Sequence, residues 1–155
     1  MHRPRWALPR GRARAAIVVG VVVFLAISGL LARFLSTENT ERDAVLAVLS
    51  AQARGDAAGM LARLGRCGEQ PACAATERRN AAGLRRSGAV KILSLKSSTA
   101  YSLTGGHGRT RVAWIVIGRL PVVQCVEVRR AGSVLGGMAV SLQYLSAPIP
   151  NEANC

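Results

Sequence analysis

Cysteines are the residues of this 155-residue sequence whose type and spacing say most about chemistry, and there are four of them: Cys67, Cys73, Cys125 and Cys155. An even number of cysteines is typical of disulfides in an oxidising compartment. Three pairings are open. We expect Cys67 to pair with Cys73 across the short loop CGEQPAC, and Cys125 to pair with Cys155. The second bridge would close about 30 residues, for which chain entropy gives a few kcal/mol of stabilisation.

The spacing of these cysteines does not favour a metal centre or a redox centre. A structural zinc site needs ligands spaced as CxxC or companion histidines, and a dithiol redox site is usually a CxxC pair as well. The sequence contains neither pattern. We therefore expect structural disulfides, no metal and no cofactor.

Candidate acids and bases are few, and no catalytic motif joins them. Hydrolases, dehydratases and isomerases need a positioned acid or base. His107 lies in a glycine-rich segment, residues 105–108, which we interpret as a hairpin loop because no helix follows it to bind phosphate. Asp43 and Asp56 are helix-start residues, and Glu127 between two valines would point outward from a half-buried strand. GxSxG, HExxH and GxxxxGK[ST] are absent, so we predict no catalytic residue and no enzyme.

Three side chains could bind a small molecule if the folded domain has an open pocket. Trp114 and Tyr144 fall in predicted strands, where each lines either the core or a pocket, and Glu127 is a strand carboxylate that could join them. A deep pocket containing Glu127 would favour small-molecule binding. A filled interior with Glu127 in solvent would favour a module without a ligand cavity.

The elements that position these residues begin with an apolar segment, residues 15–35. Its first 18 residues carry no charge, and as a helix they extend about 27 Å, close to the roughly 30 Å hydrocarbon core of a bilayer. A lone segment can cross a bilayer only as a helix. We expect an uncleaved transmembrane helix rather than a signal peptide. The apolar run is long, and the sequences near its end match poorly to the small-x-small pattern of a signal-peptide cleavage site.

Charge around this segment predicts its orientation. Five arginines precede it, and only Arg33 closely follows its 18 uncharged residues. The positive-inside rule then places residues 1–14 in the cytoplasm as a basic tail. Residues 36–39 would be a polar linker and residues 40–155 an extracytoplasmic domain. The chain would thus be a single-pass protein of the cell membrane.

The net charge of +13 is reduced once the N-terminal arginines are set aside. From residue 36 onward there are 15 basic and 8 acidic residues, and 15 − 8 gives +7. Such a surface could meet anionic headgroups or cell-wall polymers, or simply be solvated. We expect no nucleic-acid partner, because the orientation keeps the domain out of the cytoplasm and the basic residues lack interleaved aromatic residues.

Helix signals come first along the domain, and strand signals follow. Thr40 and Asp43 have the pattern of a capping box that begins a helix, Gly55 and Asp56 form a corner before a second helix, and residues 72–86 predict a third. Alternating and β-branched residues then predict four strands, at residues 90–103, 110–120, 122–130 and 135–145. The expected fold is α+β: an N-terminal transmembrane helix, then two or three helices packed on a curved four-stranded antiparallel sheet.

The run AVLAVLSAQARGDAAGMLARL, with its Gly55–Asp56 corner, followed by a helix and long hairpins, resembles the nuclear transport factor 2-like fold. This fold is also called cystatin-like or SnoaL-like, and the chain resembles its membrane-anchored extracytoplasmic actinobacterial members. The resemblance covers roughly residues 40–145, and its sharpest feature is the helix-Gly-Asp-helix stretch. It implies a cone between helices and sheet, where enzymes of the family place Asp, His, Tyr or Arg. Homodimers are common in that family, but no residue here argues for one.

These observations predict a membrane-anchored extracytoplasmic protein that acts as a non-enzymatic binding module at the cell envelope. Its partner would be an envelope protein or an anionic envelope component. The alternative is a small-molecule-binding or degenerate enzyme-like cone with a pocket near Trp114, Tyr144 and Glu127.

Overall fold

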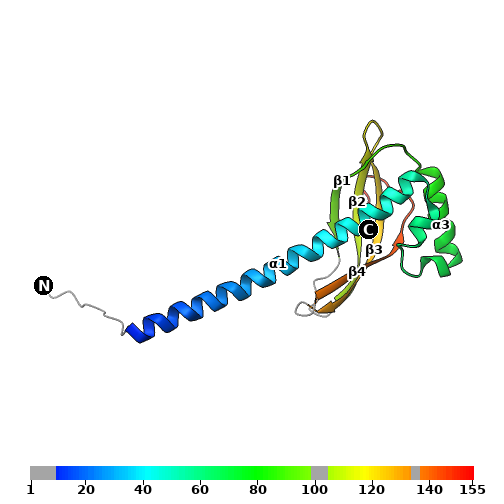
Figure 1. Cartoon of the computed structure of the whole chain (residues 1–155). Helices are drawn as coiled ribbons and strands as arrows, with labels where there is room; N and C mark the ends of the chain where they lie inside the picture. The colour runs from blue at the N-terminus through cyan, green and yellow to red at the C-terminus, as the bar shows by residue number, and fades with distance from the viewer. Residues whose placement is uncertain (1–9, 99–104, 134–136) are drawn as a thin grey trace.

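The computed structural model describes residues 10–98, 105–133 and 137–155 of the chain, and Figure 1 labels its main elements. The elements are α1 (Arg10–Arg54), α2 (Ala57–Leu61), η1 (Cys67–Glu69), α3 (Pro71–Gly83), β1 (Val90–Ser97), β2 (Gly105–Val116), β3 (Val122–Ser133) and β4 (Gly137–Leu145). The strands form one antiparallel sheet in the order β1-β2-β3-β4. The predicted α+β class and four-stranded antiparallel sheet are confirmed. Residues 99–103 of the predicted first strand and residues 135–136 of the fourth lie outside the described residues.

A single helix of 45 residues, α1, carries the chain from the apolar segment into the domain (Figure 1). Its stretch Arg14–Ala32 is long and apolar enough to cross a membrane, and none of it is buried inside the protein. The expected helix start at Thr40 is wrong, because α1 already runs through residues 36–40. The Thr40 hydroxyl donates to the Ser36 carbonyl one turn back, at 2.9 Å. Residues 36–39 contain no Gly or Pro, so nothing interrupts a helix that continues on both sides.

The corner between α1 and α2 is built as the sequence predicts. Gly55 has a φ of +76°, the left-handed conformation in which a Cβ is strained. The Asp56 side chain then accepts a hydrogen bond from the Gly59 N–H at 2.8 Å and caps α2. The third helix, α3, runs from Pro71 to Gly83, with the proline in its first turn. It begins and ends slightly earlier than the predicted range, residues 72–86.

The glycine-rich segment at residues 105–108 is part of a strand, so its interpretation as a hairpin loop is wrong. These residues open β2 and pair with β3, from Gly105 opposite Ala131 to Gly108 opposite Val128. A Cβ on Gly105 would lie 2.5 Å from the Arg130 carbonyl oxygen. Glycine is favoured there both by this close approach of two strands and by the φ of +101° at Gly105.

The core lies between the helices and one face of the sheet. Its fully buried large apolar side chains come from both layers and are Leu49, Met60, Leu64, Trp114 and Leu145. Burying each of these contributes about 1.5–3 kcal/mol. Polar groups inside this core are paired: the Trp114 indole N–H donates to Gln124 Oε1 at 2.8 Å, and the amides of Gln52 and Gln124 bond each other at 3.0 and 3.3 Å.

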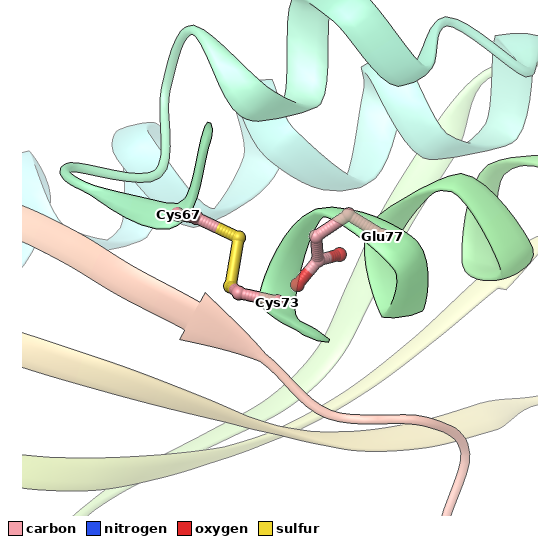
Figure 2. A group of neighbouring side chains, drawn as sticks. All are labelled: Cys67, Cys73 and Glu77. Carbon is pink, nitrogen blue, oxygen red and sulfur yellow. A yellow bond between two sulfur atoms is a disulfide. The ribbon is translucent and has the colours of Figure 1, made fainter. Parts of the chain in front are cut away.

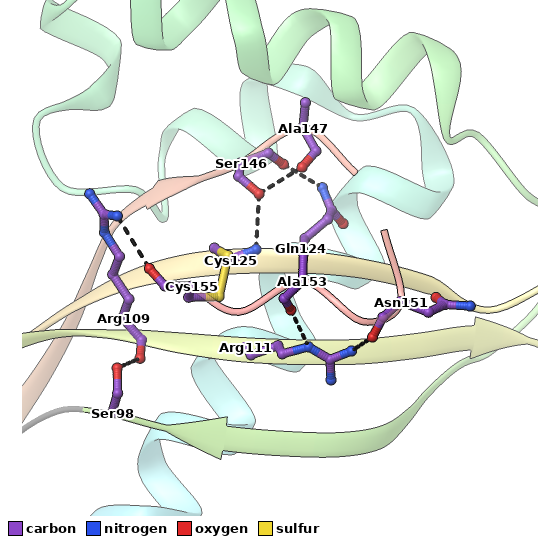
Figure 3. Close-up of a disulfide and its surroundings, with 10 residues drawn as sticks. All are labelled: Ser98, Arg109, Arg111, Gln124, Cys125, Ser146, Ala147, Asn151, Ala153 and Cys155. Carbon is purple, nitrogen blue, oxygen red and sulfur yellow. Dashed lines mark hydrogen bonds between the residues drawn. A yellow bond between two sulfur atoms is a disulfide. The ribbon is translucent and has the colours of Figure 1, made fainter. Parts of the chain in front are cut away.

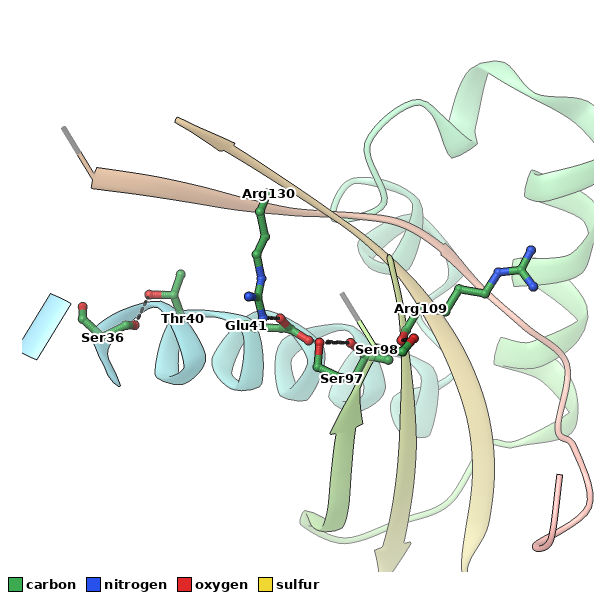
Figure 4. Close-up of polar contacts among 8 residues, drawn as sticks. Ser36, Thr40, Glu41, Ser97, Ser98, Arg109 and Arg130 are labelled. Carbon is green, nitrogen blue, oxygen red and sulfur yellow. Dashed lines mark hydrogen bonds and ion pairs between the residues drawn. The ribbon is translucent and has the colours of Figure 1, made fainter. Parts of the chain in front are cut away.

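A buried ion pair joins α1 to the sheet (Figure 4). Arg130 Nη2 on β3 lies 2.6 Å from Glu41 Oε2, and the Thr110 hydroxyl on β2 donates to Glu41 Oε1 at 2.5 Å. Glu41 is 1% exposed and Arg130 7% exposed, so neither charge is solvated by bulk water. Their attraction must therefore offset a desolvation cost of several kcal/mol for each ion. This contact fixes the rotation of α1 about its axis where the helix first meets the sheet.

Replacing Glu41 with Gln should lower the free energy of unfolding by about 3–5 kcal/mol, because it leaves the buried guanidinium without its carboxylate. The measurement is denaturant unfolding of the full chain in detergent. The matched control is Asp43→Asn, an exposed position on the same helix, which should change stability by less than about 0.5 kcal/mol. Equal effects of the two substitutions would contradict a stabilising role for the ion pair.

Candidate functional site

A depression of about 400 Å³ opens where the connection from α2 to α3 meets the sheet. The helical side contributes Arg66, Cys67, Gln70, Ala72, Cys73 and Thr76, and the strands contribute His107, Glu127, Gln143 and Tyr144. Most of these side chains are polar, and Arg66, Gln70 and His107 are exposed to solvent. Small-molecule sites of this volume are usually lined mainly by apolar groups. The depression is therefore better suited to a polar contact than to an enclosed apolar ligand.

The structure separates the three predicted ligand-binding residues. Glu127 and Tyr144 lie opposite each other on β3 and β4, and both line the depression. Trp114 is fully buried among core side chains, with its indole N–H bonded to Gln124, and it is not a lining residue of this depression. Glu127 is half-buried.

His107 lines the depression, although its glycine-rich neighbours predict a loop. Pairing of β2 with β3 puts it opposite Arg129. The alternation His107, Arg109, Arg111 with the buried Thr110 and Val112 extends the strand pattern back to this residue. That period of two was the signal in the sequence that could have placed His107 in a strand.

Both predicted disulfides are present, and they leave no free cysteine. Cys67–Cys73 joins η1 to α3 with its Cα atoms 5.3 Å apart. Cys125–Cys155 joins β3 to the C-terminal tail with its Cα atoms 5.7 Å apart. Both Cα separations are normal for a disulfide.

The second disulfide holds a tail that lies across the sheet (Figure 3). The Ile149 N–H donates to the Val123 carbonyl at 2.8 Å. This contact is an antiparallel β-bridge between the tail and the part of β3 that does not pair with β4. Arg109 donates to the Cys155 carbonyl at 3.3 Å, and Arg111 binds two further tail carbonyls. Because Arg109 and Arg111 alternate with buried residues, the tail lies on part of the face of the sheet opposite the helices, which we call the outer face.

A buried carboxylate lies beside the first disulfide (Figure 2). Glu77 is one turn after Cys73 on α3 and has no exposed surface. A carboxylate oxygen of Glu77 and the two sulfur atoms all lie within 4.8 Å of one another. Glu77 accepts hydrogen bonds from the Leu145 N–H at 3.0 Å and from Asn80 Nδ2 at 3.3 Å.

Burial raises the pKa of Glu77 from its ordinary value of 4.5 to about 7. The hydrogen bonds from Leu145 and Asn80 favour the ionised form and lower the pKa, but they offset only part of the desolvation. Glu77 therefore exchanges a proton near neutral pH. A titrating carboxyl group next to an S–S bond is the chemical feature of this corner.

Cys67, Cys73 and Glu77 are residue types that bind metals, yet they do not form a metal site in this state. Zinc is bound by cysteine thiolates, and here each sulfur is bonded to the other. The oxidised pair thus leaves the Glu77 carboxyl as the one ionisable group of the three.

Comparison of the chain with known proteins found no match to a family model, to a curated protein or to a solved structure. The resemblance to the nuclear transport factor 2-like fold therefore stays a prediction.

Replacing Glu77 with Gln should remove a pH dependence of stability. The folded protein binds the Glu77 proton more tightly than the unfolded chain, because the pKa rises from 4.5 to about 7 on folding. The stability contributed by this group is complete below pH 4.5, falls as pH rises to about 7, and is constant above it. Urea unfolding should be measured for the wild-type chain and for Glu77→Gln. As pH rises from 4.5 to about 7, the difference between their free energies of unfolding should shift in favour of Glu77→Gln. A difference that does not change with pH would contradict the raised pKa.

Proposed function

We propose that this chain is a single-pass membrane protein whose disulfide-bonded domain lies outside the cytoplasm and acts as a non-enzymatic binding module at the cell envelope. The observation that carries the proposal is α1. No residue of its apolar stretch Arg14–Ala32 is buried inside the protein, and the stretch continues without a break into the buried part of the helix. Nineteen residues of this kind are unfavourable in water but match the thickness of a bilayer.

Two independent features support the orientation. All five arginines before residue 15 precede the charge-free run that begins at Ala15, with no acid among them, as in cytoplasmic flanks of membrane helices. Both disulfides lie on the other side of the stretch, and such bonds persist in oxidising compartments.

The partner contact is proposed for four residues of the outer face, Lys96, Arg109, Arg111 and Arg129, which we call the basic face. Lys96 is opposite Arg111 in the β1–β2 ladder, and Arg109 is two residues away on the same strand. Side chains directly opposite one another project from the same side of a sheet. Lys96, Arg109 and Arg129 are exposed. A concentration of positive charge on a rigid sheet favours an anionic envelope component as the partner.

The packing of the interior supports binding at the surface rather than catalysis in a cone. Trp114 is fully buried between the layers, and the carboxylates of Glu41 and Glu77 are both engaged inside the protein. Helices on one face of an antiparallel meander agree with the nuclear transport factor 2-like resemblance, which we retain as part of the proposal.

A second candidate function is binding of a small polar molecule at the depression, which brings Glu127 and Tyr144 together with His107. This candidate no longer includes Trp114. A compound that raises the melting temperature of the wild-type chain, but not of the Glu127→Gln or Tyr144→Phe chain, would favour it over the envelope module.

The topology is tested by mass spectrometry and by protease protection. The protein extracted from membranes should retain Met1 and gain four hydrogens on reduction, two for each bridge. Protease added outside intact cells from which the wall has been removed should digest the domain and leave an N-terminal tag protected. A mature chain that starts after about residue 32 would make the protein secreted, and a protected domain would reverse the orientation.

The basic face is tested by reversing its charge. Lys96→Glu combined with Arg129→Glu should weaken binding of the full chain, held in neutral-lipid nanodiscs, to long-chain polyphosphate by tenfold or more. About 1 kcal/mol is expected for each contact between opposite charges in water, and 1.4 kcal/mol is tenfold. The control is Arg119→Glu, an exposed residue in the turn between β2 and β3. Equal weakening by the control would remove the basic face from the proposal.

A further inference from the structure

We propose that Cys67–Cys73 is an exchangeable redox disulfide, with Glu77 as its proton carrier, that accepts electrons from a dithiol entering through the depression. The inference is independent of the proposed function, because it depends only on the geometry of this corner. It goes beyond the structural role that the cysteine spacing predicts.

Access is provided by the depression. Cys67 and Cys73 are 2% and 9% exposed, and both line its wall together with the exposed Arg66 and Gln70. The bridge is thus sheltered from bulk solvent, yet a thiol within the depression can meet it. Arg66 adds a positive charge that favours an attacking thiolate.

The position of Cys73 on α3 favours the sulfur as a thiolate. Cys73 is the third residue of this 13-residue helix, within the first turn, where backbone N–H groups have no partner inside the helix. Negative charge is stabilised at that end of a helix, and cysteines there have a lowered thiol pKa.

Glu77 supplies a proton donor next to the disulfide, which a helix end by itself does not provide. It follows Cys73 by four residues, so both side chains lie on the same face of α3. Its carboxylate oxygen is within 4.8 Å of both sulfur atoms. Since the pKa of Glu77 is about 7, the group is partly protonated at neutral pH, whereas an ordinary glutamate would have no proton to give.

The reaction balances with a dithiol as the reductant. A thiolate of the dithiol attacks Sγ of Cys73, the more exposed residue, so that a mixed disulfide forms and the bond to Cys67 breaks. Cys67 leaves with the electron pair and takes the proton of Glu77. The second thiol of the dithiol then gives its proton to Glu77. Its sulfur attacks the first sulfur of the dithiol, which is bonded to Cys73 in the mixed disulfide. Cys73 leaves as a thiolate, and the dithiol is oxidised to a disulfide while the protein pair gains two electrons.

Other titratable groups near this corner come from each neighbouring element. Arg66 belongs to the segment between α2 and η1, and His107, Glu127 and Tyr144 come from the three strands that line the depression. The buried charge of α1, Glu41, is engaged by Arg130 instead. Glu69 on η1 is an exposed carboxylate in the same disulfide loop and is not a lining residue of the depression, so it is the matched control for Glu77.

The test follows both bridges of the full chain in detergent. Dithiothreitol is added, samples are quenched with acid and alkylated, and peptide mapping gives the opening rate of each bridge. Cys67–Cys73 should open faster than Cys125–Cys155, although Cys125 and Cys155 are more exposed. Its rate per dithiothreitol thiolate should fall as pH rises through about 7, the pKa of Glu77.

Glu77→Gln should slow the opening of Cys67–Cys73 by at least tenfold at pH 6 and abolish this pH dependence, within the range of general acid catalysis. Glu69→Gln should leave the rate and its pH profile unchanged, because this exposed carboxylate does not line the depression. An unchanged Cys125–Cys155 rate reports that each variant is folded. If Glu77→Gln does not fold, the wild-type pH profile and the order of opening decide the question. Faster opening of Cys125–Cys155, or a flat profile for Cys67–Cys73, would overturn the proposal.

Discussion

The contact of Glu41 with Arg130 and Thr110 is the interaction on which the arrangement of the layers depends. It lies where α1 passes from its exposed apolar stretch to the sheet. A buried carboxylate and a buried guanidinium tolerate little displacement, because either charge alone would carry the full cost of desolvation. Any rotation or sliding of α1 would separate them. Because α1 continues without a break from the apolar stretch to this contact, the ion pair ties the sheet to the helix that carries the apolar stretch.

The same demand for paired polar groups organises the rest of the interior. Gln52 on α1 bonds Gln124 on β3, which also accepts from the Trp114 indole. These bonds are directional, so they select one alignment of helix and sheet where apolar packing alone would allow several. Trp114, a member of this network, is fully buried between the layers. The described depression and the outer face are surface features where ligands and partners can be met.

The two disulfides serve different parts of the chain. Cys125–Cys155 closes 30 residues and holds the tail against Arg109 and Arg111, so its main effect is to restrict the unfolded chain and cover the sheet. Cys67–Cys73 closes only 6 residues and restricts the unfolded chain less. Its particular property is its neighbour, because Glu77 is buried with a raised pKa at the point where the bridge lines the depression.

The sequence by itself determined the features that depend on neighbouring residues: the apolar stretch, the Gly55–Asp56 corner, the order of helices and strands, and a pairing of cysteines favoured by short separation. Local signals misled where longer structure took over. Thr40 carries a capping pattern, but helix propagates through it because helix is already formed on both sides. Residues 105–108 carry a turn composition, but their backbone groups are taken up by the neighbouring strand β3. Only the tertiary structure decided which distant side chains meet. Glu41 and Arg130 are 89 positions apart, and Glu77 reaches the Leu145 N–H 68 positions away. Such contacts depend on strand register and helix rotation, which are set by packing the whole core and leave no pattern in a local stretch of sequence.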